Sequence, residues 1–254
     1  MFAWPARRAQ CAFVLVLVMA VVAAGCGGSV FGRQFEYEEE IFLSLDGSVT
    51  VVVNASLPAL VTLRGAALNT AADARVDRDA VRAFYECAGV EVVRVSRPWT
   101  REGRRFVQVR IDADDLRVLS DCRAFSWATY SLTREQGTMR YTQRIGAIAP
   151  AGAPGPSAAS PIRGDELVAV RMHLPSRITF HNAPSREVER GNILTWEQPL
   201  RNRMAGEPID IDVRMDERSI LRRTMTVFGL AVGAALVLLT LAVWWVKRKG
   251  HRRA

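Results

Sequence analysis

The chain has 254 residues and a formal net charge of +8 at pH 7, with 34 basic and 26 acidic residues. Seven of the basic residues lie in the two terminal segments, which leaves 27 basic and 26 acidic residues in the region between them. Because a near-neutral region has no electrostatic footprint for phosphate backbones, the charge distribution argues against nucleic acid as a partner.

The N-terminal residues have the pattern of a secretory signal peptide. Arg7 and Arg8 form a charged region, and Cys11–Ala24 is an uncharged run of 14 residues, too short to span a bilayer comfortably. The run ends in Ala23–Cys26, which resembles a bacterial lipobox, so we predict cleavage and lipidation of Cys26. Two alternatives remain open: ordinary cleavage with an incidental Cys26, and an uncleaved second span.

The first extracytoplasmic elements are predicted to be two strands, Gln34–Leu45 and Ser48–Ser56, around the hairpin signal Asp46-Gly47. Four carboxylates of the first strand are interpreted as a solvated strand edge that blunts pairing, rather than as a cation site. These are Glu36, Glu38, Glu39 and Glu40.

A pattern of 35 residues occurs twice. The motif D-x-D-x-apolar-R-x-apolar-x-acid-C begins at Asp77 and again at Asp112, which defines copies at 77–111 and 112–146. Cys87 and Cys122 occupy equivalent positions, so a disulfide between them is the expected arrangement, with two free thiols or a metal pair as alternatives.

Each copy is predicted to be a short helix followed by a hairpin. In the first copy the strands are 90–98 and 104–112, and the helix precedes them. In the second copy a shorter helix at 114–122 precedes strands 124–134 and 138–148. The predicted fold class is therefore α+β, an antiparallel β-rich domain with the duplicated unit packed on one sheet face.

The remaining segments complete the predicted domain organisation. A signal peptide at 1–25 is followed by an α+β domain at 26–148, and an Ala/Pro/Gly/Ser-rich linker at 149–160 leads to a β-rich segment at 161–219. That segment contains short strands at 166–174, 176–182, 192–197 and 209–215.

The last segment has the pattern of a membrane anchor. No charged residue occurs from Met225 to Val246, and a helix over Thr226–Val246 has a length of about 31 Å, close to the hydrocarbon thickness. We predict a single-pass transmembrane helix at 225–246 and a basic cytoplasmic tail at 247–254, with the bulk of the chain outside. The residues expected at the membrane interface are Trp244, Trp245, Lys247, Arg248 and Lys249.

Motifs for catalysis and cofactor binding are missing from the sequence. It contains no G-x-S-x-G, H-E-x-x-H, P-loop or dinucleotide-binding pattern, so we expect neither an enzyme nor a cofactor. His173 and His181 are interpreted as ordinary strand residues, because a zinc site needs three or four convergent ligands.

The C-terminal third has a recognisable series of motifs, namely Val168–Pro175, Ile178, Asn182, Gly191-Asn192, Trp196 and Ile209–Met215. Together with Cys26 and the single span, these motifs resemble the LppM-like group of bacterial envelope lipoproteins. The resemblance implies a β-rich extracytoplasmic domain of the lipid-binding or glycolipid-binding type without catalytic residues.

The predicted function is that of a membrane-anchored extracytoplasmic binding module for lipid, glycolipid or another envelope component. The alternative is a structural or assembly protein that pairs with an envelope protein partner. A concave apolar face between sheet and helices would favour the first function. A flat exposed edge or an apolar patch on the sheet would favour the second.

Overall fold

The computed structural model describes residues 35–71, 73–146 and 164–250. In the C-terminal helix it describes side chains only for residues 225–241 and 244. The predicted signal peptide, the lipidation site Cys26 and the predicted linker lie outside the described residues.

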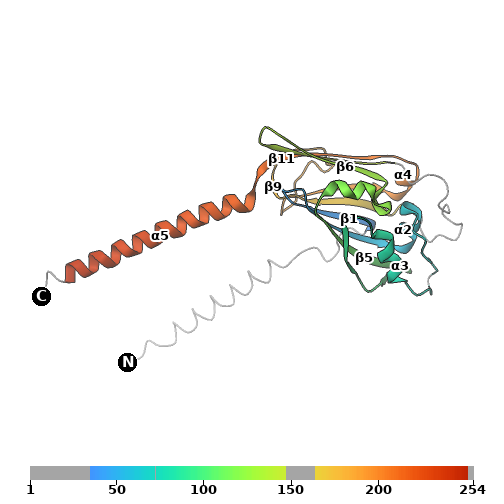
Figure 1. The fold of residues 1–254 in the computed structure, drawn as a ribbon, viewed down its shortest axis with the longest axis horizontal. Coiled ribbons are helices and arrows are strands. Elements are labelled where there is room, and N and C mark those ends of the chain that lie inside the picture. Colours follow the sequence, from blue (N-terminus) through green and yellow to red (C-terminus); the bar gives the residue numbers. More distant parts are fainter. Residues whose placement is uncertain (1–34, 72, 147–163, 251–254) are drawn as a thin grey trace, which may run out of the picture. The chain divides into compact units, whose positions relative to one another are not determined.

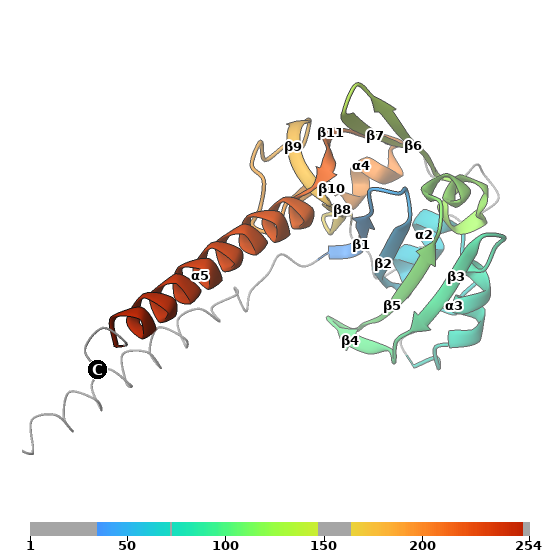
Figure 2. The ribbon, with the colours of Figure 1, turned by 60° about the vertical axis from the view of Figure 1, so that its left-hand side comes forward.

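The larger sheet has seven strands in the order β10-β8-β1-β2-β5-β3, with β4 paired to β5 (Figure 1 and Figure 2). Strands β1 and β8 are parallel, whereas the other pairs of this sheet are antiparallel. The expectation of antiparallel strands was wrong for this one pair, because a long connection lets a strand return in either direction. The strands are β1 (Phe35–Leu43), β2 (Val49–Ser56), β3 (Val90–Val95), β4 (Trp99–Arg101), β5 (Arg104–Ala113), β8 (Leu167–His173) and β10 (Ile193–Pro199).

The second sheet has four antiparallel strands in the order β6-β7-β11-β9. The hairpins of the two repeat copies therefore lie in different sheets, and the prediction of one shared sheet was wrong. The segment predicted at 161–219 contributes two strands to each sheet, so it is not a separate β-rich unit. The strands are β6 (Ala128–Glu135), β7 (Thr138–Ile145), β9 (Ser176–His181) and β11 (Ile209–Ser219).

Local chemistry explains the hairpin between β1 and β2. The Asp46 carboxylate accepts a hydrogen bond from the Ser48 backbone N–H at 3.0 Å, and Gly47 has φ of 99°. Glycine adopts this left-handed backbone without a steric penalty. The turn aligns the strands so that Tyr37 lies opposite Ala55.

Helix α2 (Leu57–Arg64) follows β2 directly and contacts β1, β2 and β5 (Figure 2). The Ser56 hydroxyl accepts from the Ala59 backbone N–H, and Gly65 ends the helix with φ of 66°. Neither α2 nor the five-residue α4 (Leu200–Met204) is predicted from the sequence, because such short helices give little periodic signal.

The two repeat copies differ where the helices were predicted. The first forms α3 (Arg78–Tyr85), which Asp77 caps by accepting two backbone N–H groups. In the second copy Asp112 belongs to β5 and accepts a hydrogen bond from Thr50. Only a short stretch is then left for helix formation, and it forms the 3-10 turns η1 (Leu116–Asp121) and η2 (Arg123–Phe125).

The inner faces of the two sheets share one hydrophobic core. It includes Ile41 and Val170 from the seven-stranded sheet and Tyr141 and Val213 from the four-stranded sheet. The α+β class is confirmed, with mixed sheets and few helices.

Helix α5 (Ile220–Gly250) has 31 residues and follows β11. Every side chain described between residues 225 and 241 is exposed, and so is Trp244. Over the residues described, no helix is both long enough and apolar enough to cross a membrane.

Candidate functional site

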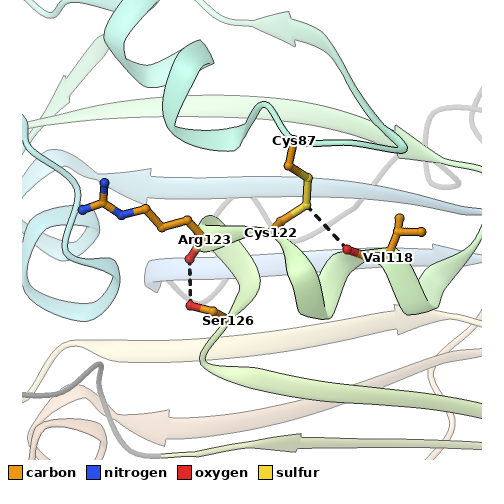
Figure 3. The surroundings of a disulfide bond; sticks show 5 residues. All are labelled: Cys87, Val118, Cys122, Arg123 and Ser126. Atoms are coloured by element: carbon orange, nitrogen blue, oxygen red, sulfur yellow. Dashed lines mark hydrogen bonds between the residues drawn. A yellow bond between two sulfur atoms is a disulfide. The ribbon is translucent and has the colours of Figure 1, made fainter.

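Cys87 and Cys122, the equivalent cysteines of the two repeat copies, are joined by a disulfide (Figure 3). Their Cα atoms are 5.6 Å apart, and Cys122 is buried. The bond connects the residue that follows the cap of α3 with the junction of η1 and η2. It therefore ties together the helical segments of the two copies.

The other predicted site residues lie outside this region. Trp244 is 56% exposed on α5. The backbone of α5 also includes Trp245, Lys247, Arg248 and Lys249, but the structure does not describe their side chains. Cys26 lies outside the described residues.

Strand β1 carries the unexpected feature of this fold. It lies in the interior of the seven-stranded sheet, between β8 and β2, and Glu36, Glu38 and Glu39 are buried. The interpretation of its carboxylates as a solvated edge was wrong. Because side chains alternate along a strand, Glu39 points into the core between the sheets, whereas Glu36, Glu38 and Glu40 share the opposite face.

The inner cluster is built around Glu39 and comprises Glu39, Tyr37, Arg64, Trp127 and Arg203. Glu39 Oε1 accepts a hydrogen bond from the Tyr37 hydroxyl and lies 3.6 Å from Arg64 Nη2. The Arg64 guanidinium carbon is 3.7 Å from the centre of the Trp127 ring, and that of Arg203 is 5.3 Å from it. Arg64 belongs to α2 and Arg203 to α4, so both cations come from helices that the sequence does not predict.

Electrostatics in the inner cluster follow from burial. Burial raises the pKa of Glu39, while the charges of Arg64 and Arg203 and the hydrogen bond from Tyr37 lower it. Burial also lowers the pKa of Arg203, and the neighbouring Arg64 charge acts in the same direction. Such a cluster costs desolvation energy, which Coulomb attraction between the charges offsets only in part.

The outer cluster on the opposite face of the sheet consists of linked ion pairs. Arg171 lies between Glu38 and Glu40, with nitrogen to oxygen distances of 3.3 and 3.5 Å. Arg104 Nε lies 3.2 Å from Glu36, and its other nitrogens contact carboxylates from two further segments. Each carboxylate of β1 on this face therefore has a cationic neighbour, and this pairing offsets part of the burial cost.

Glu38→Gln is expected to change how stability depends on pH. Burial is the largest cause that raises the pKa of Glu38 above 4.5, against the lowering effect of Arg171. A carboxyl group with a raised pKa in the folded state contributes stability that is complete below the unfolded pKa and is lost as the pH rises through the folded pKa. Relative to the wild type, the variant should gain stability from pH about 4.5 upward, by at most about 1.4 kcal/mol per pH unit.

The measurement is urea unfolding of both proteins at several pH values. Burial lowers the pKa of the neighbouring His173, but this histidine is present in both proteins, so the difference isolates Glu38. Asp46→Asn is the control of opposite sign, because hydrogen bonds from Ser48 lower the pKa of the exposed Asp46. A difference between Glu38→Gln and wild type that does not vary with pH would contradict the prediction.

Two hollows on the described surface are lined by polar and apolar residues together. One of about 260 Å³ lies over β6, β7 and β11, where Thr129, Ser131, Thr142 and Asp212 contribute to its lining. A second, of about 190 Å³, lies between α2 and the start of α3, where the apolar Leu57, Leu68 and Val76 lie beside the charged Arg75 and Asp77. Neither hollow is the wholly apolar concave face that would favour the lipid-binding prediction.

His173 and His181, which were interpreted as ordinary strand residues, lie on two different sheets. His173 on β8 stacks on Phe42 with ring centres 4.0 Å apart, whereas His181 belongs to β9. Among residues 35–71, 73–146 and 164–250, no group of three or more His, Cys, Asp or Glu side chains could hold a metal ion.

No protein-family model matches the sequence, and no curated protein is significantly similar to it. Among solved structures, the NMR structure of the folded domain of LppM from Mycobacterium tuberculosis aligns with a TM-score of 0.39 and 14% sequence identity. The alignment covers 74% of this chain and 94% of that one. The predicted LppM-like resemblance thus has a weak structural neighbour and no support from sequence comparison. A TM-score this low carries no argument about what this chain binds.

Proposed function

We propose that this chain is a membrane-associated protein of the bacterial envelope whose β-rich body is a binding module rather than an enzyme. The observation that carries the proposal is the exposed apolar surface of α5. Its exposed large apolar residues are Met225, Val227, Phe228, Leu230, Val232, Leu236, Val237, Leu238, Leu239, Leu241 and Trp244.

The distribution of these side chains favours lipid over a protein groove as the covering partner. All the side chains described from 225 to 241 are exposed, so the apolar surface surrounds the helix instead of forming one stripe. The uncharged run from Met225 to Val246 includes residues whose side chains lie outside the description. Taken whole, its 22 residues correspond to about 33 Å of helix, against a hydrocarbon core of about 30 Å. Our proposal is that this run crosses the bilayer and that the basic tail stays in the cytoplasm.

Truncation after Ser219 is expected to release the protein from membranes. Because a lipid on Cys26 would be a second anchor, the comparison uses Cys26→Ser in both the full and the truncated chain. The full chain should stay in the membrane pellet after alkaline carbonate extraction, while the truncated chain should move to the supernatant. Recovery of the full Cys26→Ser chain in the supernatant would contradict the proposed span.

The same pair of proteins tests the binding module. Lipids that co-purify with the full chain and not with the truncated chain are bound by α5, whereas lipids retained by both are bound by the β-rich body. Mass spectrometry of the extracted lipids identifies the class. A truncated chain that retains no lipid, even when offered envelope lipids, would contradict lipid binding by the body.

The assembly alternative has its own supporting observation in the exposed edges of the sheets. Phe180 on edge strand β9 is 44% exposed, and Val93 on edge strand β3 is 43% exposed. An unpaired edge with exposed apolar side chains can take an added strand from a partner. Retention of the truncated Cys26→Ser chain on membranes without bound lipid would favour this alternative.

A further inference from the structure

The inner cluster holds buried nitrogen atoms that donate no hydrogen bond to any described residue. Arg64 is the clearest case, since its side chain is 1% exposed and none of its three guanidinium nitrogens makes a hydrogen bond. Arg203 Nε and Trp127 Nε1 are also buried without an acceptor. Leaving such groups unsatisfied is costly, and unpaired groups of this kind in native proteins call for water or an ion.

Donors outnumber acceptors in this region. Against five nitrogen atoms without a hydrogen bond, three of them on Arg64, the inner cluster offers one carboxylate oxygen without a hydrogen bond, Glu39 Oε2. The unpaired hydroxyls of Tyr85 and Tyr130 can act as either donor or acceptor. Water brings two donors with its acceptors, so water alone leaves the excess of donors in place. A ligand that accepts hydrogen bonds and donates none removes this excess of donors.

The charge balance of the inner cluster also indicates a ligand that only accepts hydrogen bonds. The inner cluster contains two guanidinium groups and one carboxylate, and burial together with Arg64 lowers the pKa of Arg203, as expected where positive charge is in excess. The guanidinium carbons of Arg64 and Arg203 lie near the same Trp127 ring, which places them no more than about 9 Å apart by the sum of the two distances. One negative charge between them would balance the cluster.

We propose that the inner cluster binds one small monovalent anion, of the size of chloride or formate, between Arg64 and Arg203. A monovalent ion matches the single excess charge. A small one is required because the residues that form the inner cluster are closely packed in the core, with Tyr37, Glu39 and Arg203 each 0% exposed. The site lies between the sheets and does not depend on whether α5 enters a membrane.

Anion-dependent thermal unfolding of the full chain in detergent tests the proposal. Sodium gluconate, whose anion is too large for the site, is replaced stepwise by sodium chloride or sodium formate at constant ionic strength. The unfolding midpoint should rise with the logarithm of the concentration of each small anion, by about 5–10 °C at a hundredfold excess over the dissociation constant. Isothermal titration of the wild type with sodium chloride in gluconate buffer should give one site per chain.

The matched variants separate this site from surface binding. The double variant Glu39→Gln with Arg64→Met removes one charge of each sign and should lose the response to chloride and formate. Arg144→Met, at an exposed arginine paired with Asp210, should keep the wild-type response. The proposal is overturned if wild-type unfolding is the same in gluconate, chloride and formate, or if the double variant keeps the response. If the double variant does not fold, the wild-type titration decides, and absence of a saturable site refutes the proposal.

Discussion

Arg64→Met should destabilise the protein by about 3–5 kcal/mol at neutral pH, because it leaves Glu39 buried without its nearest cation. Glu39 is 0% exposed, so water cannot replace the lost partner without opening the core. The loss should decrease at lower pH, where the buried carboxyl group takes up a proton, since burial already raises its pKa.

Urea unfolding of the full chain in detergent measures this effect. The double variant Glu39→Gln with Arg64→Met should recover part of the lost stability, because the side chain at position 39 is then neutral and its burial no longer needs a nearby cation. The control, Arg144→Met, carries the same substitution at an exposed ion pair and should change stability by less than about 1 kcal/mol. An Arg64→Met protein as stable as this control would contradict the prediction.

Removing the disulfide is expected to cost about 3–4 kcal/mol. The two cysteines are 35 residues apart, and the chain-entropy model gives this value for a closed loop of that length. The bond also joins α3 to the 3-10 turns η1 and η2, which meet in the core through Tyr85 and Phe125, with ring centres 5.8 Å apart.

The test compares Cys87→Ser with Cys122→Ser, made together, against the oxidised wild type in urea. The double variant should unfold at lower urea, and the slope of its transition should increase because an uncrosslinked chain exposes more surface. Wild type treated with a reductant should unfold like the double variant, while Cys26→Ser should unfold like the oxidised wild type. Equal midpoints for the double variant and the oxidised wild type would contradict the prediction.

Distant parts of the chain assemble the inner cluster around the buried Glu39. Its cations come from α2, which follows β2, and from α4, which follows β10, so both ends of the domain contribute to one cluster. Arg203 also donates to the carbonyl oxygens of Glu207 and Gly146, which fixes its position beside Trp127. The cluster therefore forms only when both sheets and both helices are in place.

Sequence by itself determined the local elements. The Asp46-Gly47 hairpin and the strands of both repeat hairpins depend on turn residues and on alternation between neighbours, and these signals lie within a few residues of one another. The cysteine pair was predictable for a similar reason, because the repeat places Cys87 and Cys122 at equivalent positions.

Tertiary structure alone decided which strands pair and which charges are buried. The parallel contact of β1 with β8 and the separation of the repeat hairpins into two sheets join segments far apart in the chain, which local periodicity does not encode. The same holds for Glu39. A carboxylate on an alternating strand is expected to face water, and it is stable in the core only because Arg64 and Arg203 arrive from distant helices to pair with it.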